Sequence, residues 1–339
     1  MAGTAFLVAN GTAGWVKEVT PGTTPGTGTV FFIPVIDPVI NPMQLFLDDA
    51  ALRGSPVGLY DMVQGVRHDE FDHKSYVYAD TFPVYVKALL GGTDTVTATT
   101  TSYSHSIPLL NAATTGSQPP SYSICVFDGA NYLIVPGARA SSLNLTFGAE
   151  AAAECTLKWS GNPYADSTSA PAPFTSPSYS AEHPIPAWNA TISMAGSSLA
   201  YISSGELTID RKTAPIFTMG TASPYTNFVG PIEVSGKFTA VVATNADPFS
   251  ISTTAGFALT RAPKAVVITL TDPNDINTAI HDSISFTMTD VQFTDPKRVK
   301  GKDYLELEVA FKAEGDTTDA ASGYSPIIAT LVNGVSAAF

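Results

Sequence analysis

The chain has 339 residues, of which only 14% are charged, and its 30 acidic and 17 basic residues give a formal net charge of −13. This balance excludes a surface that grips nucleic acid, because phosphate binding requires clustered Lys and Arg. Two cysteines are too few for a disulfide framework, and no apolar run approaches the roughly 20 residues of a transmembrane helix. We therefore expect a soluble, unprocessed chain with buried free thiols, long enough for two domains.

Residues 1–42 are rich in small residues and lack a regular apolar pattern. A compact domain rarely carries such a segment for its own stability. We expect an N-terminal arm that orders against partner subunits through Phe31 and Phe32, with simple disorder as the alternative.

From residue 43 onward the chain repeats itself once in weak register. Leu45 has a counterpart in Leu207, and similar matches continue as far as Trp159 and Phe311. A period of roughly 150 residues indicates a duplicated domain and not a short-period solenoid. Chance matches between common residue types on similarly patterned strands are the alternative. The expected order is a first copy at residues 43–165, a Pro-, Ser- and Ala-rich linker at 166–190, and a second copy at 191–314.

Alternating apolar and polar residues rich in Thr, Val, Ile and Tyr predict that both copies are mainly β. In residues 304–311 the odd-numbered positions 305 to 311 are apolar and would pack, while Glu306 and Glu308 would meet water. The basic stretch Lys297, Arg298, Lys300 and Lys302 is interpreted as a solvated hairpin tip.

Each copy is expected to contain one short helix. In the first, Asp80 or Thr81 caps Phe82–Leu90 and Gly91 ends it. In the second, Asp247 opens Phe249–Ala258, although Ser, Thr and Gly weaken its helix propensity.

Two turn-rich stretches occupy matching places in the copies, Ala50–Met62 and Lys212–Val229. They are longer than hairpin geometry requires, so they either bind something or are tolerated decoration. The tail from about Gly315 to Phe339 is interpreted as a second arm, and Ile327 and Leu331 are its candidates for contact with partner subunits.

The motif RHDEFDHK at residues 67–74 is the strongest candidate for chemistry. On a strand, His68 and His73 point to opposite faces, so they cannot bind one metal ion without a bend, and solvated or interface polar residues are the favoured interpretation. DPNDIN at 272–277 lacks the oxygen ligands of a calcium loop. No nucleophile elbow, phosphate loop or dinucleotide motif is present, so we expect no enzyme activity, no cofactor and no metal.

Three segments carry a family resemblance: KEVTPGTTPG (17–26), RGSPVGLYDMVQGVRH (53–68) and KGKDYLELEVAFKAEGD (300–316). In this order, with paired sheet segments between them, they resemble the major tail tube proteins of long-tailed, non-contractile bacteriophages (siphophages), in the version with a duplicated tube domain. The resemblance covers nearly the whole chain, but it rests on glycine turns and alternating strands. The second copy departs from it because its loop has no arginine-glycine pair.

The resemblance implies two tandem β-sandwich or half-barrel domains, each flanked by a helix, with terminal arms. Sheets from six such domains would join around a lumen, so a trimer of duplicated chains is favoured over a hexamer. Rings would stack through the long loops, for which the candidate residues are Arg53, Gly54, Tyr60, Asp61, Lys212, Tyr225 and Phe228.

The implied partners are further copies of the chain, a tape measure protein, tail-tip and terminator proteins, and double-stranded DNA in transit without specific binding. The implied location is the virion tail, after synthesis in the host cytoplasm. The alternative function is a carbohydrate-binding or adhesin-like β-sandwich, because 13 tyrosines and 3 tryptophans could supply sugar-stacking platforms. The matching strand positions of Trp159 and Phe311 favour core packing over such a platform.

Overall fold

The structure is a computed structural model that describes residues 11–51, 53–99, 102–112, 116–199, 201–242, 263–277, 280–300 and 304–339. Within these residues the chain is mainly β, with antiparallel sheets and one α-helix, so the predicted fold class is confirmed.

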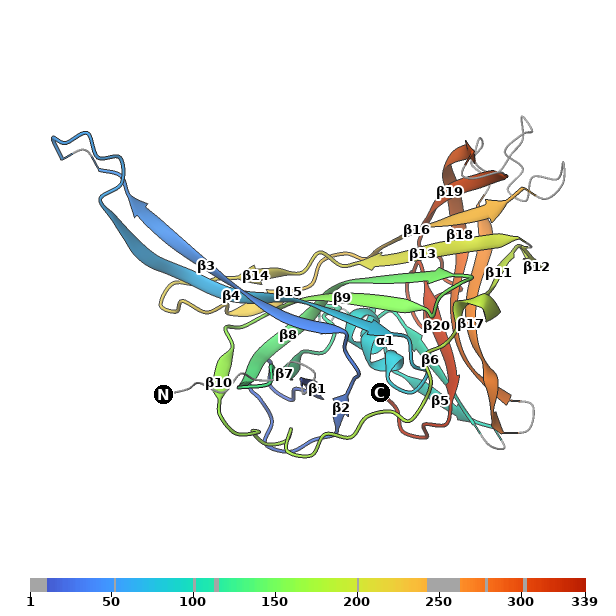
Figure 1. Ribbon diagram of the computed structural model, residues 1–339, viewed down its shortest axis with the longest axis horizontal. Helices are drawn as coiled ribbons and strands as arrows, with labels where there is room; N and C mark the ends of the chain where they lie inside the picture. Colours follow the sequence, from blue (N-terminus) through green and yellow to red (C-terminus); the bar gives the residue numbers. More distant parts are fainter. Residues whose placement is uncertain are drawn as a thin grey trace, which may run out of the picture.

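Eight strands form one continuous antiparallel ladder through the molecule, in the order β3-β4-β9-β8-β13-β16-β19-β18 (Figure 1). The first four come from the N-terminal half and the last four from the C-terminal half. Their bounds are β3 Asp37–Asp49, β4 Asp61–Tyr76, β9 Glu154–Gly161, β8 Tyr132–Gly148, β13 Ile202–Asp210, β16 Glu233–Val241, β19 Leu305–Ala313 and β18 Ile280–Lys300.

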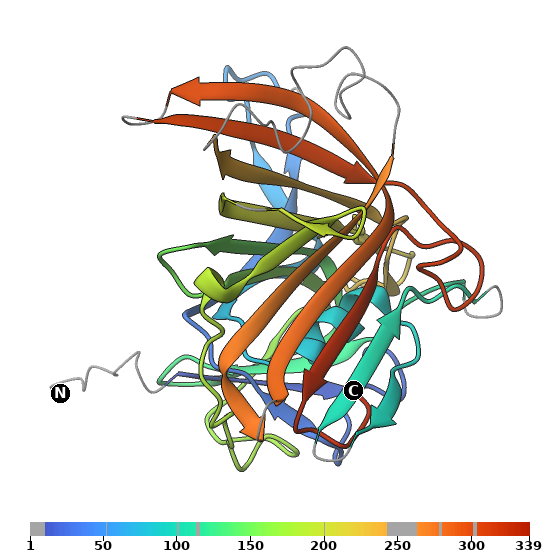
Figure 2. The same ribbon diagram turned by 90° about the vertical axis from the view of Figure 1, so that its right-hand side faces the viewer.

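The other strands pack beside this ladder. β2, β1 and β7 continue from the first part of β8, while β17, β18, β20, β6 and β5 are successive neighbours, and Figure 2 shows the orange and red members side by side. Their bounds are β1 Thr12–Lys17, β2 Val30–Phe32, β5 Thr95–Ala98, β6 Tyr103–Pro108, β7 Tyr122–Phe127, β10 Ala165–Ser167, β11 Thr191–Met194, β12 Ser197–Ser198, β14 Ala214–Ile216, β15 Thr226–Phe228, β17 Lys264–Asn277 and β20 Ile328–Asn333.

Helix α1 spans Phe82–Leu90, as the sequence predicts. Pro83 fits the first turn, where a helix needs no amide donor. Gly91 ends the helix in the left-handed conformation (φ 75°), and its N–H donates to the carbonyl of Lys87. Thr81 is the N-cap residue but makes no side-chain capping bond. The second predicted helix, Phe249–Ala258, lies outside the described residues.

Residues 12–17, expected in the N-terminal arm, form β1 within the molecule. β1 lies between β2 and β7, and Trp15 is fully buried. The following turn is fixed by the buried carboxylate of Glu18. That carboxylate accepts hydrogen bonds from the amides of Gly22 and Gly137 and from the hydroxyls of Ser121 and Ser123.

The C-terminal segment is also part of the folded body. β20 lies between β18 and β6, so a strand from the end of the chain joins the two halves. Ile327 and Leu331 are fully buried and Phe32 is nearly so, which places these interface candidates in contacts within this chain. Phe31 is half-buried, and its ring packs against that of Phe339.

The expected linker, residues 166–190, packs closely against the body. Phe174 and Ile185 are buried, and the amide of Ile185 donates to Val77 at the end of β4. One hydrophobic cluster contains side chains of both halves, including Trp15 and Leu331. Burial of apolar surface therefore holds the two halves together.

The two halves share their strand order. Trp159 of β9 pairs with Phe71 of β4, and Phe71 pairs with Ile40 of β3. In the same way, the pairings of β19 with β16 and of β16 with β13 connect Phe311 to Leu207. With Trp159 and Phe311 as equivalents, Ile40 therefore corresponds to Leu207. The sequence match between Leu45 and Leu207 is displaced by five positions, because strand repeats alone do not fix a register.

Candidate functional site

The eight-stranded ladder has one buried face and one exposed face. Side chains alternate along each strand, and those of Leu145, Leu207, Phe238 and Val309 lie in the core. Acidic side chains outnumber basic ones on the exposed face. The acidic side chains there are Glu70, Asp72, Glu154, Glu206, Asp210, Glu233, Glu306 and Glu308, and the basic ones are Lys74, Lys158, Lys237, Lys297 and Lys312.

Within the residues that the structure describes, both ends of this ladder lack a partner strand. Val291 pairs with Lys264 on one edge and with Ala313 on the other. Along residues 296–300, no described strand pairs with the Lys264 edge of β18, and none pairs with the outer edge of β3. Rows of unpaired backbone groups are templates for pairing with another chain.

The β3–β4 hairpin extends far from the body of the molecule (Figure 1). It exposes a row of apolar side chains to solvent, with exposed fractions from 44% at Leu59 to 56% at Val63. The exposed set is Met43, Leu45, Phe46, Leu47, Val57, Leu59, Met62 and Val63. An apolar strip of this kind marks an interaction surface.

The predicted loop residues of the first copy lie at the tip of this hairpin. Arg53 forms an ion pair with Asp49 and stacks over the ring of Tyr60, 4.9 Å from its centroid. Gly54 adopts a left-handed conformation (φ 70°) that suits glycine. The side chain of Asp61 accepts a hydrogen bond from the amide of Met62. The structure therefore brings Arg53, Gly54, Tyr60 and Asp61 together.

The corresponding loop of the second copy lies along the first half. The amide of Arg67 donates to Ala222 at 2.8 Å, and the buried Asn227 donates to Gly137 at 2.9 Å. The other predicted loop residues are at the surface. Tyr225 and Phe228 are exposed, and Lys212 forms an ion pair with Glu233.

A buried arginine holds the base of this second loop. The Arg211 guanidinium donates to the carbonyls of Leu89, Ser117 and Gly230. Burial and the nearby Arg139 lower the pKa of the Arg211 guanidinium to about 10. These bonds connect α1, the segment between β6 and β7, and the residue that follows the loop, so Arg211 fixes the position of the loop on the first half.

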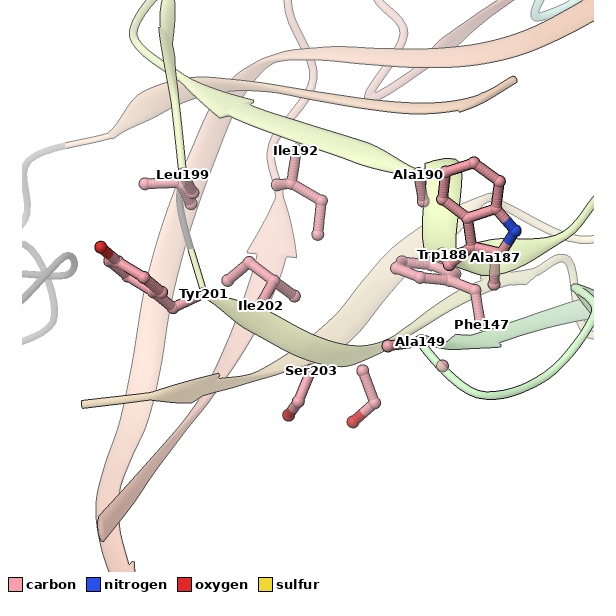
Figure 3. A pocket seen from close by; sticks show the side chains of 12 residues that line it. Phe147, Ala149, Ala187, Trp188, Ala190, Ile192, Leu199, Tyr201, Ile202 and Ser203 are labelled. Atoms are coloured by element: carbon pink, nitrogen blue, oxygen red, sulfur yellow. The ribbon is translucent and has the colours of Figure 1, made fainter. Parts of the chain in front are cut away.

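A cavity of about 160 Å³ lies at the other end of β13 (Figure 3). Trp188 and Tyr201 flank it, and each is 62% exposed. No carboxylate or amide side chain is among its described lining residues, although such groups normally orient a polar ligand. Trp15 and Trp159 are core residues, so two of the three tryptophans cannot serve as sugar platforms.

The two histidines of the RHDEFDHK motif lie on opposite faces of β4. His73 is buried between Trp15 and Tyr85, and desolvation lowers its pKa to about 3. His68 lies on the other face, 3.2 Å from Glu70. In the part of the chain that the structure describes, no group of three or more His, Cys, Asp or Glu side chains could hold a metal ion.

Both cysteines are buried and unbonded, and desolvation raises the pKa of the Cys125 thiol to about 12. No described helix is long and apolar enough to cross a membrane. The features of the described residues that could contact a partner are the open sheet edges and the exposed apolar hairpin. Sequence reasoning identified the hairpin loop but could not assign the open edges to particular strands, because only the strand order reveals them.

A family model described as phage tail tube protein matches residues 9–313, a span that includes both halves of the ladder and the hairpin. No curated protein matches the chain.

Proposed function

The chain belongs to the phage tail tube protein family, and on this premise we propose that it assembles into stacked rings that form the hollow tube of a siphophage tail. The observation that carries this proposal is the continuous ladder with an open edge at each end. Pairing the last strand of one copy with the first strand of the next removes both open edges of the ladder when the ring closes.

The internal symmetry supports three chains in a ring. Each chain supplies two groups of four strands in the same order, joined by β8 and β13. A trimer would therefore present six quasi-equivalent units around the lumen, as expected for a duplicated tube domain.

The exposed face of the ladder is the proposed lumen wall. Its excess of carboxylates repels phosphate, so double-stranded DNA would pass without being held. Ion pairs such as Lys74–Glu154, at 2.8 Å, reduce the net negative charge of this face but do not reverse its sign. The buried face, which carries α1, would then point outward.

The hairpin is the proposed stacking element. Its exposed apolar side chains would be buried against the adjacent ring, and head-to-tail contacts of this kind build filaments. Arg53, Tyr60 and Asp61 at its tip, and Tyr225 and Phe228 on the second loop, are the proposed stacking residues.

This function is structural and involves no catalysis. The tube would enclose a tape measure protein during assembly, grow from tail-tip proteins and end at a terminator protein. It would form in the host cytoplasm and reside in the virion tail.

Electron microscopy of the purified chain over a range of concentrations tests the proposal. End-on averages should show hollow rings or tubes with threefold or pseudo-sixfold symmetry. Compact monomers at every concentration, even with purified tail-tip complexes as initiators, would contradict it. The carbohydrate-binding alternative would then be tested by glycan binding to the chain and to Trp188→Ala.

A further inference from the structure

The junction between the two halves of the chain is a template for the junction between two chains. In the internal junction, Leu145 of β8 lies opposite Leu207 of β13. Leu207 corresponds to Ile40 of β3 through the ladder steps from Trp159 and Phe311. The open outer edge of β3 is therefore the counterpart of the β13 edge that β8 occupies.

The same ladders identify the counterpart of Leu145. Thr156 lies three residues before Trp159 and pairs with Asn144, while Glu308 lies three residues before Phe311 and pairs with Lys297. Asn144 thus corresponds to Lys297. The next residue along each strand makes Arg298 of β18 the counterpart of Leu145.

Hydrogen-bond alternation shows which backbone groups face the open edges. The amide of Val77 donates to Ala153, so odd-numbered β4 residues bond to β9 and even-numbered ones bond to β3. In the β3–β4 register this leaves even-numbered residues of β3 facing outward, namely Pro38, Ile40 and Pro42.

The corresponding residues of β18 also face outward. The amide of Val242 donates to Leu305, so odd-numbered β19 residues bond to β16 and even-numbered ones bond to β18. In the β18–β19 register beyond the bulge, the even-numbered β19 residues pair with Lys297 and Val299. The backbone groups of Pro296, Arg298 and Lys300 therefore face the open edge.

We propose that β18 pairs with β3 of a second copy in the register that places Arg298 opposite Ile40, and that facing prolines keep this seam weaker than the internal junction. This inference rests on the proposed ring assembly and specifies its interface. Pro296 lies opposite Pro42, and Lys300 lies opposite Pro38. Between these pairs, Lys297 lies opposite Asn41 and Val299 opposite Val39.

The prolines halve the hydrogen bonds of the seam. In the internal junction, three residue pairs centred on Leu145–Leu207 contain no proline, and each exchanges two backbone bonds. At the seam, Arg298–Ile40 exchanges two, Lys300–Pro38 only one, and Pro296–Pro42 none, because proline lacks an N–H. Edge prolines are a device against uncontrolled pairing.

Charge complementarity supports the same partner. The basic stretch that the sequence suggested as a solvated tip, Lys297 to Lys300, is the open edge of β18. In the proposed register, Lys297 faces Asn41 and, one strand further, Glu70 of the second copy. Lys297 is thus the cation of this stretch that would meet a carboxylate of the neighbour, while Arg298 and Lys300 lie on the opposite face of the strand.

Disulfide cross-linking tests the register. Asn41→Cys with Lys297→Cys would occupy a non-hydrogen-bonded pair, where β-carbons approach most closely. We expect this variant of the full chain to shift from monomer to a closed covalent oligomer on non-reducing gels. Asn41→Cys with Arg298→Cys places the thiols on opposite faces, and this control should stay monomeric on the gel.

Microscopy of the same samples separates the two proposals. Rings without the cross-link would overturn the register and leave the tube function intact. Cross-linked oligomers without tubes would support the seam and contradict stacking. Neither rings nor cross-links would overturn both.

A proline-free seam tests the second part of the inference. Pro42→Val with Pro296→Val should lower the dissociation constant for self-association by about tenfold, because both donors of that pair are restored. Pro231→Val, at an exposed proline outside the seam, is the control and should leave it unchanged. Sedimentation measures the difference. Unchanged or weaker association of the seam variant would overturn the role assigned to the prolines.

Discussion

Leu145 and Leu207 lie opposite each other where the two halves of the chain meet, and both side chains are buried. The contact joins two sheets into one ladder whose core is shared. The halves should therefore unfold together and not as independent domains.

Truncation of one member of this pair tests that coupling. Leu207→Ala should lower the free energy of unfolding by about 2–5 kcal/mol, because it removes buried methyl groups and leaves a cavity. Chemical denaturation followed by tryptophan fluorescence and circular dichroism should show one shifted transition. Ser142→Ala, on the exposed face, should change the free energy by less than about 0.5 kcal/mol. Two separate transitions, with only one displaced, would contradict a shared core.

Removal of the hairpin tip separates folding from assembly. Replacing residues 51–60 by a tight Asn-Gly turn leaves the core intact, because the tip side chains are largely exposed. We expect an unchanged melting temperature and loss of tubes by electron microscopy. Full-length tubes from this variant would count against the stacking assignment.

The apolar strip on the hairpin can be tested without a deletion. Leu47 and Val63 lie opposite each other and are each more than half exposed. Changing both to Gln should reduce tube length and number, because burial of that surface would drive stacking, while the melting temperature stays the same. Val19→Gln alters an exposed apolar residue outside the hairpin and should have no effect on tubes. Equal loss in both variants would point to general surface effects.

Asp282 in β18 should make stability depend on pH. Burial, followed by repulsion from Glu182, Asp272 and Asp80, raises the pKa of Asp282 from its ordinary value of 3.8 to about 7. The folded state therefore binds more protons than the unfolded state between these values, and stability is lost as the pH rises through this window. Asp282→Asn should stabilise the chain by about 1–2 kcal/mol at pH 8 and have little effect at pH 4.

Thermal unfolding of both proteins across this range provides the measurement. Glu182→Gln removes one source of the repulsion and should produce a smaller change of the same sign. A constant difference between Asp282→Asn and the unaltered chain at all pH values would rule out the titration of Asp282 as its cause.

Local signals in the sequence predicted the local structure. Pro83 and Gly91 fix the ends of α1 through backbone geometry alone, and alternation in residues 304–311 marks β19. These features depend on neighbouring residues, so a single chain segment contains the information.

Contacts between distant residues could not be predicted in this way. β1 looked like part of an arm because its partner strand β7 lies more than a hundred residues away, and only that pairing buries Trp15. β20 is similar, because its neighbours β18 and β6 come from different halves. The open edges of β3 and β18 are visible only once the strand order is known, since any strand can lie at an edge.

The ladder between β8 and β13 also determines how the chain would carry mechanical load. Its bonds run across the strands, from the Ser142–Asp210 pair to the Gly148–Ser204 pair. A pull along the strands would strain all of these bonds together in shear. A pull across them would peel the junction open one bond at a time. The same junction is thus stiff in one direction and compliant in the other.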